Sequence, residues 1–144
     1  MTNGMIVREV EKKDSGVLAK LMTELGYPTS TEGMGRRLAE ISADPSYCAL
    51  VAEKDGRVLG MVGLHVERYY EKDGSCARII SLVVGSEHRG EGVGRVLISA
   101  GEDWAREKGA RDVMLTTHKR RAGAHDFYRS VGYEATGYRF YKEL

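Results

Sequence analysis

Residues 89–95 read Arg-Gly-Glu-Gly-Val-Gly-Arg and form the most informative stretch of this 144-residue chain. The apolar run 79–84 precedes them, and a long amphipathic segment follows. A strand, a glycine-rich turn and a helix in this order present backbone N–H groups to a phosphate. Glycine at every second position lets the backbone approach an anion without a side-chain clash. The stretch therefore predicts a phosphate-bearing ligand, and a glycine-rich turn without a ligand is the alternative.

Two common phosphate-binding loops do not fit this stretch. A P-loop requires lysine followed by serine or threonine after its last glycine, whereas Arg95 and Val96 follow Gly94. A dinucleotide-binding fingerprint requires a third glycine at the position that Arg95 occupies, within a repeated βαβ pattern that this chain lacks. The pattern that remains is Arg89-x-x-Gly92-x-Gly94.

A second motif follows at residues 124–133, which read Ala-His-Asp-Phe-Tyr-Arg-Ser-Val-Gly-Tyr. Together the two motifs resemble the GNAT superfamily of N-acetyltransferases. In that superfamily the first motif is the acyl-CoA pyrophosphate loop, and the second is a short helix that carries a tyrosine beside the thioester sulfur. The resemblance covers nearly the whole chain from Tyr47 onward and, more weakly, residues 1–46.

Hydrophobic periodicity, helix caps and turn residues predict the elements of the chain. Asp14 is expected to cap the first helix, which Gly26 ends, and Thr29 with Glu32 forms a capping-box pattern for the second. The predicted helices extend to about Leu25 and over residues 30–43, 93–108 and 122–130. The predicted strands cover residues 5–10, 47–53, 57–69, 77–84, 112–117, 133–136 and 138–142. This order matches the GNAT order, so the resemblance implies a mixed α/β fold. A central, mostly antiparallel twisted sheet is flanked by helices in one domain over residues 1–144.

The resemblance also implies acetyl-CoA as cosubstrate and a set of cofactor-binding residues. In the strand before the loop, the backbone of three residues would pair with the pantetheine arm and donate an N–H to the thioester carbonyl. These residues are Leu82, Val83 and Val84. The pyrophosphate is expected on the amides of Arg89, Gly90, Glu91, Gly92, Val93, Gly94 and Arg95. His118, where the superfamily often has an asparagine, and Phe127 complete the set.

Tyr128 is expected to be the general acid that protonates the coenzyme A thiolate, since a phenol with a pKa of about 10 is protonated at neutral pH; an aromatic core residue is the alternative. Within the superfamily the chain resembles the aminoalkylphosphonate N-acetyltransferases, through residues 60–65, 82–84, 119–121 and 138–140. That group has a glutamate where this chain has Ser81, so the general base stays open. His65 and Glu67, on one strand face, and a chain of waters are the candidates.

Composition bounds the remaining choices. The 22 basic and 21 acidic residues give a net charge of +1, which offers no electrostatic case for nucleic acid or a membrane surface as partner. Cys48 and Cys76 have no metal-ligand spacing, which favours free thiols in a reducing cytoplasm and no metal site. The N-terminus has no secretory signal pattern, and no apolar run approaches the ~18 residues of a membrane span.

The leading hypothesis is an enzyme that transfers the acetyl group of acetyl-CoA to a primary amine of a small molecule by direct attack in a ternary complex. An aminoalkylphosphonate is one candidate acceptor. The alternatives are a protein or peptide N-acetyltransferase, a non-catalytic acyl-CoA-binding module and a purely structural interaction domain. Acceptor specificity is expected in the first two helices and the turn at residues 69–74, and the terminal strands offer a surface for a homodimer.

Overall fold

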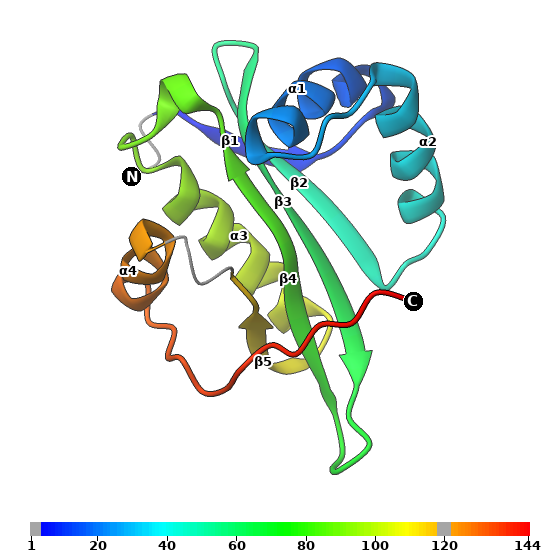
Figure 1. Ribbon diagram of the computed structural model, residues 1–144, viewed down its shortest axis with the longest axis vertical. Coiled ribbons are helices and arrows are strands. Elements are labelled where there is room, and N and C mark those ends of the chain that lie inside the picture. Colours follow the sequence, from blue (N-terminus) through cyan, green and yellow to red (C-terminus); the bar gives the residue numbers. More distant parts are fainter. Residues whose placement is uncertain (1–3, 118–121) are drawn as a thin grey trace. The chain divides into compact units, whose positions relative to one another are not determined.

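The computed structural model describes residues 4–117 and 122–144 (Figure 1). Backbone contacts divide the chain into two compact units, Met1–Met114 and Leu115–Leu144. The first unit contains nearly all of the sheet and the helices α1, α2 and α3, and the second contains helix α4. The fold class predicted from the sequence is confirmed, because a mostly antiparallel sheet is combined with helices.

The sheet has five strands whose spatial order follows the sequence, β1-β2-β3-β4-β5. Their bounds are β1 Ile6–Glu9, β2 Tyr47–Lys54, β3 Arg57–Arg68, β4 Ser75–Val84 and β5 Ala110–Leu115. The first four pair antiparallel. Asp55 and Gly56 connect β2 to β3 with φ of 52° and 76°, and this pair of positive angles is what a tight two-residue hairpin turn requires.

Helices cover both faces of this sheet. The helices α1 (Ser15–Leu25) and α2 (Thr31–Ser42) form a buried cluster with Met61 of β3 and Val83 of β4. Side chains alternate between faces along a strand, and the neighbours of Met61 in β3 face helix α3 (Val93–Glu107). A Cβ on Gly60 would lie 3.3 Å from the Leu97 side chain of α3. The apolar residues on both faces of β3 therefore reflect two packed layers.

Gly60 brings the backbones of β3 and β4 unusually close together. A Cβ at this position would lie 2.7 Å from the carbonyl oxygen of Val83 and 3.2 Å from the Cα of Val84. Both neighbours are backbone atoms, so they cannot move aside as the end of a flexible side chain can. The end of β4 is thus seated against β3 at a distance that only glycine permits.

Strand β4 contains one extra residue, Ile80. Gly63 pairs with Ser81, but the next residue, Leu64, pairs with Ile79. Such a bulge bends the strand and leaves one residue out of the ladder. It also reverses the alternation of faces beyond it, so that Val83 joins the α1 and α2 cluster, although a regular strand would direct it to the α3 face.

Two expectations about helix starts are wrong. Asp14 precedes α1 with helical backbone angles, φ −84° and ψ −4°, and its side chain does not cap the helix; a capping side chain normally requires an extended backbone. Instead, Arg8 and the Glu11 N–H bind its carboxylate. For α2, Ser30 rather than Thr29 caps, because Ser30 is extended and its hydroxyl accepts from Gly33 N at 3.0 Å.

The second unit contains α4 (Ala122–Ser130), with the bounds predicted from the sequence. Tyr133 N donates to Tyr128 O at 3.0 Å, and Gly132 has φ of +97°, which ends the helix. The strands predicted at 133–136 and 138–142 are wrong, since residues 133–144 form no strand. A single residue, Gly137, separates the two segments, fewer than the roughly two residues of the shortest common hairpin loop. The strand pair expected to bridge a homodimer is therefore absent from these residues.

Candidate active site

The predicted pantetheine strand is the part of β4 that follows the bulge. Leu82, Val83 and Val84 pair with Val62, Met61 and Gly60 of β3. The next residue continues this pairing, because Gly85 N donates to Leu59 O at 2.8 Å. One edge of the strand is thus fixed by β3 immediately before the chain turns towards the glycine-rich loop.

The loop at residues 89–95 owes its shape to backbone angles. Gly90 and Gly92 have φ of +80° and +84°, and a Cβ on either would meet no atom within 4 Å. The left-handed conformation, rather than lack of space, therefore calls for glycine at both positions. Gly92 stands at the N-terminus of α3 without a side-chain cap, and Val96 N donates to Gly92 O at 3.1 Å.

Helix α3 presents its N-terminus in the middle of this loop. The N–H groups of a first helical turn have no partner inside the helix, and the helix dipole favours negative charge there. Val93 anchors this end, since only 1% of its surface is exposed. The predicted pyrophosphate residues thus combine an uncapped helix N-terminus with two glycines that keep side chains out of the approach, and this arrangement fits a pyrophosphate.

One acidic side chain lies within the loop. The Glu91 carboxylate is 3.7 Å from Nδ1 of His88, which belongs to the short 3₁₀ turn η2 (Ser86–His88). The predicted contribution of Glu91 is its backbone amide.

The two candidate bases share a face of β3, as expected, and each contacts a neighbour. The His65 ring lies 4.4 Å from the ring of Tyr47, its cross-strand partner in β2. The Glu67 carboxylate forms an ion pair with Arg78 of β4 at 3.0 Å. Ser81 lies opposite Gly63, next to the bulge. The structure thus leaves the choice between His65, Glu67 and water open.

The remaining predicted residues belong to the second unit or lie outside the described residues. In α4, the Phe127 and Tyr128 rings meet edge to face at 5.4 Å, and Tyr128 meets Tyr133 in the same way at 6.2 Å. These contacts hold Tyr128 within an aromatic cluster. The position of Tyr128 relative to the loop stays a prediction. His118 and the basic run 119–121 lie outside the described residues.

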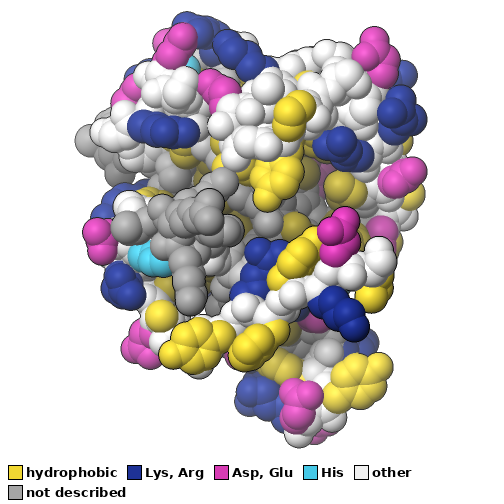
Figure 2. Space-filling view, in the orientation of Figure 1, with side chains coloured by type: hydrophobic (Ala, Val, Ile, Leu, Met, Phe, Trp, Pro, Cys, Tyr) yellow, Lys and Arg dark blue, Asp and Glu magenta, His cyan; other side chains and the backbone are white. Residues whose placement is uncertain are grey.

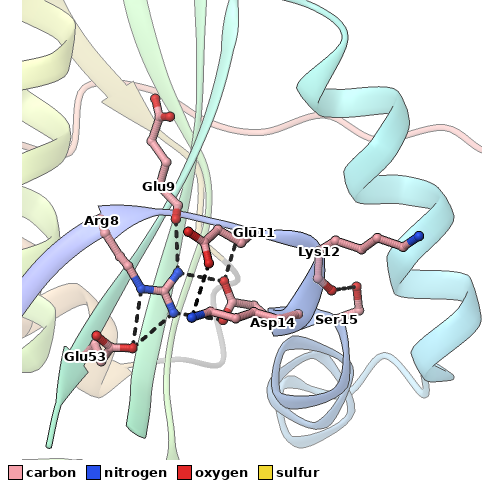
Figure 3. A network of polar contacts seen from close by, with 8 residues as sticks. Arg8, Glu9, Glu11, Lys12, Asp14, Ser15 and Glu53 are labelled. Atoms are coloured by element: carbon pink, nitrogen blue, oxygen red, sulfur yellow. Dashed lines mark hydrogen bonds and ion pairs between the residues drawn. The ribbon is translucent and has the colours of Figure 1, made fainter. Parts of the chain in front are cut away.

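The structure also contains a polar network that the sequence did not reveal. Figure 3 shows Arg8 of β1 between Asp14 and Glu53, with ion pairs of 2.8 and 3.1 Å. Arg8 holds the pKa of the Asp14 carboxyl below its usual range, mainly through a side-chain hydrogen bond. The network borders a hollow of about 420 Å³ between α1, the β2–β3 hairpin and residues 85–88. Glu53 lies 45 residues from Arg8 in the sequence, so no local motif could have indicated this pairing.

Comparison with known proteins identifies the family. A profile of the acetyltransferase (GNAT) family matches residues 16–133, which include the loop, α3 and α4. The chain belongs to the GNAT acetyltransferase family. It is 33% identical over 124 residues to the aminoalkylphosphonate N-acetyltransferase of Salmonella typhimurium, an alignment that covers 86% of this chain and 78% of that protein.

Solved GNAT structures share the fold. The GNAT acetyltransferase of Staphylococcus aureus superposes with a TM-score of 0.85 at 27% identity, covering 98% of this chain and 99% of that one. An aminoglycoside N-acetyltransferase solved in complex with CoA has a TM-score of 0.85 at 19% identity, over 97% of this chain and 94% of that one. The latter likeness concerns the fold alone.

Residues 4–117 and 122–144 contain no group of three or more His, Cys, Asp or Glu side chains arranged to hold a metal ion. None of the helices in these ranges combines the length and apolar character that crossing a bilayer would demand. Figure 2 shows acidic and basic side chains interspersed on the visible face.

Proposed function

We propose that this GNAT protein transfers the acetyl group of acetyl-CoA to the primary amine of a small molecule, with residues 1–144 acting as one GNAT domain in the cytoplasm. One observation carries the proposal. The bulged strand β4 leads directly into a loop whose Gly90 and Gly92 adopt positive φ and whose end is the uncapped N-terminus of α3. This arrangement suits a long thioester substrate with a pyrophosphate at one end.

The chemistry requires an amine, a positioned carbonyl and a proton donor. The amine nitrogen attacks the thioester carbonyl carbon, the C–S bond breaks, and coenzyme A leaves as a thiolate. In our proposal a backbone N–H of Leu82, Val83 or Val84 polarises the carbonyl oxygen, since donors aimed at developing negative charge lower the barrier. Tyr128 donates its phenolic proton to the thiolate. The proton lost by the amine goes to His65, to Glu67 or to water.

The relatives support a small amine as the acceptor class. The Salmonella relative is an aminoalkylphosphonate N-acetyltransferase, and a solved neighbour is an aminoglycoside acetyltransferase in complex with sisomicin. Both names describe small amines, and the first has the higher identity. An aminoalkylphosphonate is therefore our first candidate acceptor. The aminoalkylphosphonate group that this chain resembles has a glutamate where this chain has Ser81, so divalent-metal dependence is the feature to vary in the assay.

The test measures coenzyme A release with a thiol reagent over a panel of aminoalkylphosphonates, aminoglycosides, polyamines, amino acids and peptides, each with and without divalent metal. The protein's own thiols contribute little background, because Cys48 and Cys76 are buried and burial raises the pKa of Cys48 to about 11. Turnover on a small amine supports the proposal. Turnover on peptides alone would replace it with the protein acetyltransferase alternative. Binding of acetyl-CoA without any turnover would favour the binding module.

A further inference from the structure

The turn between β4 and the glycine-rich loop is tied to helix α1. Ser86 Oγ donates to Glu24 Oε1 at 2.8 Å. Glu24 lies in the last turn of α1, and Ser86 begins the 3₁₀ turn η2. The two residues are 62 positions apart in the sequence, so the bond is a tertiary contact.

Gly85, the residue before this turn, is closely packed, whereas the side of the turn that faces the hollow is not. Gly85 is held by Leu59 O, and a Cβ on Gly85 would lie 3.3 Å from that oxygen and 3.6 Å from the Leu21 side chain of α1. The hollow of about 420 Å³ adjoins the same turn and the same face of α1, including Glu24 and residues 85–88. Ser86 and Glu24 are both exposed on this side, and their hydrogen bond links the turn to α1.

The turn is only three residues long, so its position determines where the loop begins. His88 N donates to Gly85 O at 2.9 Å, which closes the turn, and the His88 ring lies 3.7 Å from the Glu91 carboxylate. Arg89 follows immediately, and Gly90 and Gly92 are then reached within the loop. A shift of the turn at Ser86 would therefore be passed directly to the backbone amides at residues 89–95.

We propose that Glu24 is a positioning residue for the phosphate-binding loop, which it holds through Ser86. This inference rests on the proposed function, because it assumes that the loop binds the pyrophosphate of acetyl-CoA. Glu24 touches no substrate in this scheme. Its contribution is to keep the loop amides in the orientation that a pyrophosphate needs, which spares the complex the loss of freedom that ordering a loose loop entails.

Titration calorimetry with coenzyme A and with 3′-dephospho-coenzyme A tests the proposal. Both ligands contain the pyrophosphate and differ at the ribose phosphate. We expect Ser86→Ala and Glu24→Ala each to lower the affinity for both ligands by the same factor. This factor should be roughly three- to tenfold, the effect of losing one charge-assisted hydrogen bond at an exposed site. The double variant should be no weaker than either single variant, since both remove the same bond. Ser86→Thr keeps the hydroxyl and should bind like the wild type.

Kinetics separate positioning from a general structural effect. The KM for acetyl-CoA should rise in Ser86→Ala and Glu24→Ala while the KM for the amine stays unchanged. Glu107→Ala, on the exposed surface at the C-terminal end of α3, is the matched control and should leave all constants unchanged. If Ser86→Ala and Glu24→Ala both bind coenzyme A as tightly as the wild type, the inference is overturned and the proposed function stays intact. A wild-type protein that binds neither ligand would overturn the proposed function itself.

Discussion

Arg8 and Asp14 face each other through two parallel hydrogen bonds, from Nη1 to Oδ2 at 2.8 Å and from Nη2 to Oδ1 at 2.9 Å. Two-point contacts of this kind between a guanidinium and a carboxylate are among the stronger polar contacts in proteins. They tie the first strand to the start of α1, and Glu53 of β2 binds the same guanidinium. The helix that carries Leu21 and Glu24 is therefore anchored to the sheet through Asp14, the residue that precedes it.

Asp14→Asn should lower the free energy of unfolding at pH 7 by about 2 kcal/mol, because it leaves the part-buried Arg8 guanidinium with one carboxylate fewer. The pKa of Asp14 is lowered in the folded protein. Its stabilising effect is therefore full above the unfolded pKa of about 3.9 and is lost as the pH falls through the folded pKa. Urea denaturation at several pH values should show the gap between wild type and variant closing in acid. Asp55→Asn, in the exposed hairpin turn, should be neutral throughout. A gap that does not change with pH would contradict the prediction.

Gly60→Ala should destabilise the protein by about 2 kcal/mol, since its Cβ would press on the Val83 carbonyl oxygen at 2.7 Å. The displaced end of β4 should also bind coenzyme A more weakly. Gly63→Ala is the matched control in the same strand, where the nearest atom to a Cβ is 3.7 Å away. Chemical denaturation and calorimetry measure both effects. Equal stability of the two variants would refute the close approach.

Gly92→Ala should cost about 1–2 kcal/mol of stability through its left-handed backbone, since its Cβ meets no neighbour. Gly26→Ala, at the end of α1, has φ of +113° and equally open surroundings, so it should cost a similar amount. The two variants should differ in coenzyme A affinity, which only Gly92→Ala lowers. Loss of affinity in both would mean that instability, rather than the loop, is responsible.

Tyr128→Phe should reduce kcat by roughly a hundredfold or more, the usual contribution of a general acid, while the KM for acetyl-CoA changes little. The control is Tyr133→Phe, which removes a hydroxyl from the aromatic neighbour of Tyr128 in the same unit. Steady-state kinetics on the best amine of the panel gives the comparison. Unchanged kcat in Tyr128→Phe would remove this residue from the mechanism.

Local sequence signals predicted most of the fold. Helix α4 has the predicted bounds, and α3 differs by one residue at its end, because glycines and apolar periodicity mark these boundaries in the chain itself. Strand β5 begins at Ala110 rather than residue 112, since it starts directly after Gly109 ends the helix region. The capping errors at Asp14 and Thr29 have a different origin. In the first case Arg8 binds the Asp14 carboxylate, and in the second the adjacent Ser30 caps α2 instead of Thr29.

The candidate site was predictable where it depends on backbone conformation. Gly90 and Gly92 indicate a left-handed backbone by their residue type alone, because glycine adopts positive φ without strain. Contacts between distant segments carry no such mark, which is why the Glu24–Ser86 bond could not be found from the sequence. The partners of His65 and Glu67 come from the neighbouring strands β2 and β4, and strand register decides them.

The extra residue in β4 changes how this strand must be compared with others. In the sequence, Ile80 is one more apolar residue in an apolar run. In the structure it is the extra residue of the bulge, so every side chain after it points to the opposite face from the one that a regular strand would give it. An alignment that matches Val83 to a regular strand without a gap would assign it to the wrong layer. Deleting Ile80 would remove this offset, because Ser81 would then follow Ile79 directly and pair with Gly63 in a regular ladder. Leu82 and Val84 would keep the α3 face, and Val83 would stay with α1 and α2 in a strand without a bulge.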